Sequence, residues 1–491
     1  MKTMIQFFNQ YIYLMLSVIL TCVSMSCKDD LPGAWDTSDK YTVLKSIKLV
    51  NAGADGNKVL IGTIDPDTKM VTFPRVDLET DFTNLRFEAE VSDGAVLEQN
   101  VYSLEFGEGQ ASRSIVFKVV NSPRSGEYLA NIVLKLPPAG AGFDQPTVID
   151  YTANALGYAV YPTYTGLATR GAAFDGENVL VVSRSGSTNP HYLKLSDLRN
   201  GIINKYNANI TGVSGGTLVV QTGALIGGNM IVANISGTLS ASPLKFYYYP
   251  NYVTGYANAP QVVSFDGSAY NVSSLVRMGD NMTYNLDNNG NGTIFTVNNA
   301  ANTMLKLVVS NFTTITDAKS FSVDGLSLSF ATTCYQVGKT NQFIMTTYGA
   351  ALRIIDGDGA ILYTDNGTVF PANATAARVM EFNGARYLLL LTAPHTGLTN
   401  TKLQVYDIST GSNVVEALTK FAEKDALDRK PVYDYSFDYA TINGARISQI
   451  DWHVVKDEEG KDKTLQIFGS LSDAGFAVIE FPVKTLTDED E

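Results

Sequence analysis

The chain has 491 residues, of which 17% are charged and 45% hydrophobic, with 41 glycines and 26 tyrosines. It is too long for one ordinary domain, and its composition is typical of strand-rich globular proteins rather than of disordered chains or coiled coils. The formal net charge of −13 argues against a nucleic-acid partner, which would need a basic face.

The N-terminus has the layout of a secretory signal peptide over residues 1–26. Lys2 is its only charge, and the uncharged run 11–26 is shorter than the roughly 20 residues of a spanning helix. Cys27 follows directly and resembles the cysteine of a bacterial lipobox, although Ser24 stands where leucine is usual. We therefore expect lipidation of Cys27, and an ordinary signal-peptidase cut is the alternative.

A polar tether is expected over residues 27–40. Its Lys28, Asp29 and Asp30 resemble the lysine-plus-acidic-pair signal that sends lipoproteins of Bacteroidetes to the outside of the outer membrane. The resemblance implies a protein that is anchored in the outer membrane by its N-terminal lipid and faces the cell exterior. The alternative is that these residues only keep the tether soluble.

The cysteines predict a fold without an intramolecular disulfide. Cys22 lies in the signal, Cys27 is the expected lipid site, and Cys334 is the one that remains. Cys334 is expected to be a small buried hydrophobic residue in a strand.

Residues 41–136 form the first expected domain. Six or seven short apolar runs alternate with turn signals, and this density of strands is typical of a β-sandwich. The turn at 62–65 and the strand at 71–74 resemble those of immunoglobulin-like modules near the N-termini of Bacteroidetes surface lipoproteins. The resemblance implies an immunoglobulin-like β-sandwich that acts as a spacer.

The Pro- and Gly-rich segment 137–147 predicts a linker, 148–484 is the main body, and 485–491 is an acidic tail. The body repeats at intervals of about 55 residues, the period of a four-stranded propeller blade with long loops. The repeats begin at or near Arg170, Gln221, Arg277, Cys334, Arg378 and Arg446.

Six blades are favoured by how the ends of the body complement each other. The last repeat is too short, and the strand-like segment 148–164 would complete it, so that no sheet edge is left free. Seven blades are the alternative, because the long interval 378–446 could hide further strands. That interval also holds a helical pattern at 414–427, which we expect to be an insertion between strands.

No metal or cofactor site is expected. His191, His395 and His453 fall in three different repeats without zinc-ligand spacing, and no nucleophile or paired-carboxylate motif can be assigned. A protein without catalytic activity is therefore favoured, and an enzyme is left open.

Four arginines are candidate ligand-binding residues. If equivalent positions of the repeats surround the central channel, Arg170, Arg277, Arg378 and Arg446 could converge at one mouth and attract an anion. In the structural alternative, they bind backbone carbonyls or acids of neighbouring blades, such as Glu381 or Asp451.

Aromatic side chains form the second candidate set. Tyr248 and Tyr435 lie in tyrosine-rich strands, and Trp452 and His453 stand close to Arg446. Exposed rings of this kind suit sugars or peptides, and packing between blades is the alternative.

Taken together, these features resemble uncharacterised Bacteroidetes surface lipoproteins, many of which belong to glycan-uptake systems. The resemblance implies a surface-anchored binding protein that captures a glycan, either neutral or anionic, on the propeller face and works with an outer-membrane uptake complex. A propeller-based polysaccharide lyase or hydrolase and a protein–protein interaction scaffold are the alternatives.

Overall fold

The computed structural model describes residues 39–485 except 108–109, 137, 153–160, 162–167, 185–187, 299–300, 366, 394–400, 438–446 and 473. This part of the chain divides into two compact units, residues 39–136 and 138–485. Cys27, Lys28, Asp29, Asp30, His395 and Arg446 lie outside the described residues.

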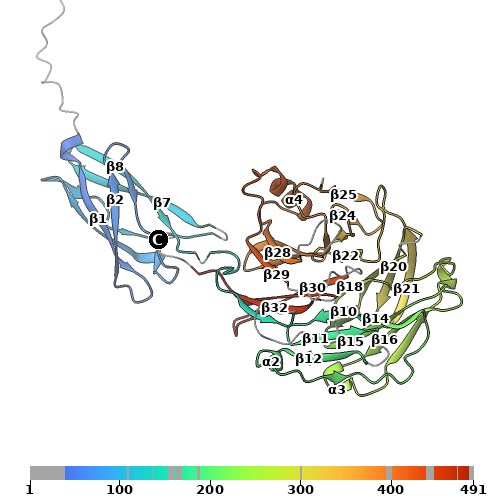
Figure 1. The fold of residues 1–491 in the computed structure, drawn as a ribbon. Coiled ribbons are helices and arrows are strands. Elements are labelled where there is room, and N and C mark those ends of the chain that lie inside the picture. The colour runs from blue at the N-terminus through green and yellow to red at the C-terminus, as the bar shows by residue number, and fades with distance from the viewer. Residues whose placement is uncertain are drawn as a thin grey trace, which may run out of the picture. The chain divides into compact units, whose positions relative to one another are not determined.

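The N-terminal unit is all-β and is built on one eight-stranded sheet (Figure 1). Its strands are arranged in the order β5-β7-β8-β3-β2-β1-β4-β6, antiparallel except for the parallel pair β3 and β8. The structure does not show the expected immunoglobulin-like sandwich of two separate sheets, since one curled sheet surrounds a single core. The strands are β1 (Leu44–Ala52), β2 (Lys58–Asp65), β3 (Met70–Thr72), β4 (Leu85–Val91), β5 (Val96–Leu97), β6 (Val101–Tyr102), β7 (Ser112–Asn121) and β8 (Arg124–Val133).

The core of this unit follows from alternation along the strands. In β1, Ile47 and Leu49 are fully buried and Lys48 between them is exposed, as expected when one face of a sheet is solvated. Phe87 and Phe117 pack edge to face, with ring centroids 4.9 Å apart. A sheet that wraps its apolar face around such rings needs no second sheet to cover them.

The second unit is a propeller of six four-stranded antiparallel sheets that follow one another in sequence (Figure 1). Each sheet runs from an innermost strand, which contacts the innermost strands of its neighbours, to an outer one. The innermost strands are β10 (Thr169–Phe174), β14 (Leu218–Ile226), β18 (Met282–Leu286), β22 (Thr333–Gln336), β26 (Ala374–Phe382) and β30 (Ser448–Lys456).

The other strands of blades 1 to 3 pack outward from these. They are β11 (Asn178–Ser183), β12 (His191–Lys194) and β13 (Tyr206–Asn207) in blade 1; β15 (Asn229–Ile235), β16 (Leu244–Tyr249) and β17 (Gln261–Phe265) in blade 2; and β19 (Gly292–Asn298), β20 (Thr303–Ser310) and β21 (Thr314–Phe321) in blade 3.

Blade 6 is closed by the first strand of the propeller. Val478 in β32 pairs with Ile149 in β9, so the two ends of the propeller sequence share one sheet. The six blades and this closure confirm the sequence prediction. The remaining strands are β23 (Gln342–Thr346), β24 (Arg353–Asp356) and β25 (Ile361–Thr364) in blade 4; β27 (Ala385–Thr392), β28 (Lys402–Asp407) and β29 (Tyr433–Ser436) in blade 5; and β31 (Asp462–Leu471), β32 (Gly475–Pro482) and β9 (Thr147–Asp150) in blade 6.

The second strand of each blade is buried on both faces, because blades pack against one another on either side. All six residues of β11 are buried, and the run 388–391 of β27 is fully buried leucine. Such strands therefore appear in the sequence as continuous apolar runs without alternation.

Polar side chains join the innermost strands of successive blades. Asn285 illustrates the pattern: its Nδ2 donates to the Cys334 carbonyl at 3.0 Å, and its Oδ1 accepts from Gln336 N at 2.8 Å. These bonds satisfy backbone groups on the inner edges of the strands, where no further strand can pair. Equivalent side chain-to-backbone bonds run from Gln221 to Asp280, from Thr333 to Thr375, from Arg378 to Ile450, and from Gln449 to Arg170.

Helices are short and peripheral in the described part of the chain: α2 (Leu195–Leu198), α3 (Tyr252–Gly255) and α4 (Val414–Glu423). Helix α4 lies between β28 and β29, where the sequence predicts an insertion. Its N-cap is Asn413, whose Oδ1 accepts from Glu416 N at 3.0 Å. None of the helices in the described ranges has the length and apolar character needed to cross a bilayer.

Candidate functional site

A cavity of about 710 Å³ opens where the innermost strands of the propeller end. We call it the mouth cavity. All six blades contribute to its lining, through β10, β14, β18, β22, β26 and β30, the turns that follow β10, β14 and β18, and the helix at Tyr252–Gly255. Such a cavity at one end of a central channel is where binding residues from distant parts of a propeller chain can meet.

Arg378 and Asp451 form an ion pair in the wall of the mouth cavity. The Arg378 Nη2 bonds Asp451 Oδ1, and its Nε donates to the Ile450 carbonyl at 3.0 Å. Asp451 Oδ2 accepts from Phe174 N at 3.2 Å. Burial raises the pKa of Asp451, and the Arg378 charge and the Phe174 N–H oppose that rise. The carboxyl is thus held in one orientation by groups from blades 5 and 1.

A second carboxylate is held in the turn between β10 and β11. Asp175 Oδ1 accepts from Glu177 N at 3.0 Å and Asn178 N at 2.8 Å, while its Oδ2 accepts from the Tyr252 hydroxyl at 2.6 Å. Burial, and secondly the negative charge of Asp175, raise the pKa of Tyr252 far above its ordinary value. Tyr252 is therefore a permanent donor to this carboxylate.

Trp452 and His453 line the same cavity, in β30 next to Asp451. Trp452 is partly buried and His453 is exposed. A Cβ at Gly176 would lie 2.4 Å from the His453 ring, and Gly176 has a φ of +100°. Because residue 176 is a glycine, the turn leaves room for the His453 imidazole to line the mouth cavity.

A second cavity, of about 570 Å³, adjoins the first. We call it the side cavity. Its lining comes from blades 3, 4, 5 and 6 and from the start of α4, and it shares Tyr284, Leu286, Arg378 and Trp452 with the mouth cavity. Arg378 and Trp452 therefore stand on the boundary between the two.

The three predicted arginines among the described residues, Arg170, Arg277 and Arg378, do not meet at one mouth. Arg378 lines both cavities, whereas neither Arg170 nor Arg277 lines them. Arg170 is buried at the start of β10, and its carbonyl accepts from Gln449 Nε2 at 2.9 Å.

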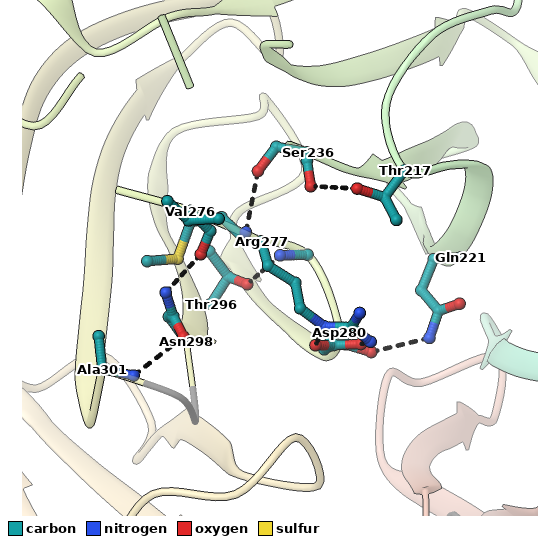
Figure 2. Close-up of polar contacts among 11 residues, drawn as sticks. Thr217, Gln221, Ser236, Val276, Arg277, Asp280, Thr296, Asn298 and Ala301 are labelled. Carbon is teal, nitrogen blue, oxygen red and sulfur yellow. Dashed lines mark hydrogen bonds and ion pairs between the residues drawn. The ribbon is translucent and has the colours of Figure 1, made fainter. Parts of the chain in front are cut away.

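Arg277 precedes β18 and is paired within its own loop. Its Nε and Nη2 bond the two carboxylate oxygens of Asp280 at 2.7 and 2.9 Å (Figure 2). Gln221 of the preceding blade donates to the Asp280 carbonyl at 3.0 Å, which links this loop to blade 2. Arg277 thus secures a turn between blades.

The two predicted tyrosines have packing roles. Tyr248 stacks on Phe312 with centroids 5.1 Å apart and donates to Asn229 Oδ1 at 3.0 Å. Tyr435 in β29 donates to Asp150 Oδ2 in β9, so it joins blade 5 to the closing strand. Neither residue lines the mouth cavity or the side cavity.

The sequence predictions missed most of the residues that build the cavities. Asp175, Tyr252 and Tyr335 come from three blades, and no short motif marks any of them. Asp175 leaves one local signal, because an Asp followed by Gly in a hairpin turn is common where the carboxylate caps backbone N–H groups. Among the described residues, no group of three or more His, Cys, Asp and Glu side chains is placed to hold a metal ion.

Fold and site together define a six-bladed β-propeller protein with a polar cavity at one mouth of its channel. A family model described as "Domain of unknown function (DUF4623)" matches residues 29–484. The chain belongs to this family.

A crystal structure of a DUF4623 family protein from Bacteroides eggerthii DSM 20697 is similar at 35% identity with a TM-score of 0.69, over 92% of this chain and 100% of that one. Dihydro-heme d1 dehydrogenase NirN in complex with DHE matches at 12% identity and a TM-score of 0.30, over 92% of this chain and 75% of that one. A mitotic checkpoint complex matches at 9% identity and a TM-score of 0.33, over 94% of this chain and 98% of that one. The last two likenesses are too weak to support an inference. No curated protein matches the chain.

Proposed function

We propose that this protein is a non-catalytic binding protein that captures a saccharide in the mouth cavity. The observation that carries the proposal is that the partly exposed Trp452 lines the same cavity as two carboxylates, Asp451 and Asp175, whose orientation is set by hydrogen bonds. An indole face packs on the C–H face of a sugar ring, and fixed carboxylates accept its hydroxyls.

Binding of full-length protein to a glycan array, followed by calorimetric titration of any hit, tests this proposal. Trp452→Ala should weaken binding by roughly tenfold or more, since a buried aromatic contact contributes on the order of 1–2 kcal/mol. Tyr41→Ala is the control, because Tyr41 is an exposed ring (37%) in the N-terminal unit. Failure to bind any plant, host or microbial polysaccharide would overturn the proposal.

We also propose that the chain is lipidated at Cys27, displayed on the outside of the outer membrane and associated with an uptake complex there, and that residues 41–136 act as a spacer. Support comes from the apolar run before Cys27 and from Lys28, Asp29 and Asp30 after it. Metabolic labelling with an alkynyl fatty acid should mark the wild-type chain and not Cys27→Ser. Protease treatment of intact cells should cleave it, and protection would contradict surface display.

A polysaccharide hydrolase or lyase is the second candidate. The observation that favours it is that Asp451, whose pKa is raised chiefly by burial, lines the mouth cavity together with Asp175. Two carboxyl groups that line one cavity could act as acid and base. Release of reducing ends or unsaturated products, abolished in Asp451→Asn, would establish it; unchanged polysaccharide after prolonged incubation would exclude it.

A further inference from the structure

The mouth cavity and the side cavity differ in charge. Three acids, Asp175, Glu177 and Asp451, line the mouth cavity, against one arginine, Arg378. The side cavity has three cations against one acid, and these residues are Lys339, Arg378, Arg386 and Glu381. Arg378 is paired with Asp451 and Arg386 with Glu381, so Lys339 leaves the side cavity with an excess positive charge beside the acidic mouth cavity.

Lys339 is the cation most available to a ligand. It lies in the turn between β22 and β23, is exposed, and makes no hydrogen bond or ion pair with the described residues. Its ammonium group has three donors on a flexible stem, which suits it to meet an incoming anion.

Arg386 also lines the side cavity, and it keeps unused hydrogen-bond donors. Its Nε bonds Glu381 Oε1 at 3.3 Å and its Nη1 donates to the Gly411 carbonyl at 3.0 Å. Its Nη2 has no partner among the described residues. These two bonds hold the guanidinium in place, so that little side-chain entropy is lost when it binds an anion.

The first turn of α4 also borders the side cavity, but it is already capped. Asn413 accepts from Glu416 N, and the Glu416 carboxylate accepts from Ser412 N at 2.8 Å and from its hydroxyl at 2.6 Å. Attraction for an anion therefore rests on the side chains of Lys339 and Arg386.

We propose that the side cavity binds the carboxylate or sulfate group of an acidic saccharide while a neighbouring sugar ring of the same ligand occupies the mouth cavity. This inference rests on the saccharide-binding function proposed above and adds the ligand class to it. Trp452 and Arg378, which line both cavities, lie where the two parts of the ligand join.

The test compares ligands that differ in the group that carries their charge. Full-length protein is titrated calorimetrically with an oligogalacturonate, with its fully methyl-esterified form, and with a keratan sulfate oligosaccharide, which carries sulfate and no carboxylate. The ester removes the carboxylate charge and keeps the sugar rings, and the sulfated ligand separates sulfate from carboxylate recognition. An acidic ligand should bind more tightly than the ester, and the difference should shrink as salt is raised.

Lys339→Ala supplies the protein side of the test. It should weaken binding of the preferred acidic ligand roughly threefold to tenfold and leave the ester unchanged. Lys430→Ala is the matched control, because Lys430 is also exposed and lines neither cavity.

Three results would overturn the inference, and they differ in what they say about the proposed function. Equal affinity for acid and ester, or an equal effect of Lys339→Ala on both, would reject the anion site and leave saccharide binding intact. Binding by none of the three ligands, together with a silent glycan array, would reject both.

Discussion

The guanidinium carbon of Arg378 lies 3.7 Å from the ring centroid of Tyr335. The two residues belong to neighbouring blades, since Arg378 is in β26 and Tyr335 in β22. The same arginine bonds Ile450 and Asp451 in blade 6. One side chain thus joins three consecutive blades at the channel wall by a cation–π contact, an ion pair and a bond to the backbone.

Arg378→Met should destabilise the propeller by about 2 kcal/mol, because Asp451, only 19% exposed, would lose its partner. Urea denaturation measures the effect, and adding Asp451→Asn should recover part of the loss. Lys420→Met is the control, since its ion pair with Glu416 is exposed and contributes about 0.5 kcal/mol at most. Equal losses in the two single variants would contradict the bridging role.

Gly171→Ala should separate blades 1 and 2. A Cβ there would lie 2.8 Å from both the Gln221 carbonyl oxygen and the Thr222 Cα, and these backbone atoms cannot rotate away. We expect the free energy of unfolding to fall by about 1–3 kcal/mol, which a lower midpoint of thermal unfolding would show. Gly142→Ala is the control, because the atom nearest its Cβ would be at 3.4 Å, an ordinary contact. Equal stability of the two variants would contradict this packing.

His191 should make the propeller less stable as the solution becomes acidic. Its Nδ1 donates to the Asn189 carbonyl at 2.8 Å, because a carbonyl can only accept, so the neutral ring accepts from the Tyr161 hydroxyl at 2.6 Å through Nε2. Burial, aided by the charge of Lys205, lowers the pKa of His191 from 6.5 to about 4.

The unfolded chain therefore takes up this proton near pH 6.5 and the folded chain only near pH 4. The neutral His191 ring contributes fully to the free energy of unfolding above pH 6.5, and this contribution falls by roughly 3 kcal/mol as the pH drops towards 4. The free energy of unfolding of the wild type should therefore approach that of His191→Gln over this pH range. Denaturation of both chains at a series of pH values measures it. Parallel pH profiles would contradict the prediction.

Glu416 should stabilise the start of α4 in a way that acid removes. Lys420, Ser412 and the Ser412 N–H bond its carboxylate and lower its pKa from 4.5 to about 2. Because the folded pKa is the lower one, the contribution is full above pH 4.5 and is lost as pH falls through 2. Hydrogen exchange of α4 amides should be faster in Glu416→Gln than in wild type at pH 5, and the difference should shrink near pH 2. Glu423→Gln, at the other end of α4, is the control.

The number of blades could be predicted because each blade repeats one sequence pattern. Doubly buried second strands such as β11 and β27 leave long apolar runs, and the strand before Tyr151 has no partner until the last repeat supplies one. The architecture of the N-terminal unit could not be predicted in this way, because strands with alternating apolar and polar residues occur both in sandwiches and in single curled sheets.

The candidate site was less predictable, because the position of a residue in its repeat does not give its depth in the channel. Arg378 is the fifth residue of the nine-residue β26, whereas Arg277 lies before β18 at a φ of +56°. Innermost strands of four to nine residues shift equivalent positions along the axis. Tyr335, Arg378 and Asp451 come together only when blades 4, 5 and 6 pack against one another.

The pairing of β9 with β32 also sets an order of events for the newly made chain. Residues 147–150 leave the ribosome more than 320 residues before their partner strand, so the first part of the propeller to be synthesised is among the last to find its place. Until then blade 6 has an open edge, and an incomplete chain presents it to proteases and to other copies. Only a chain synthesised through β32 can close the ring, so an interrupted chain keeps an exposed sheet edge that the full-length protein lacks.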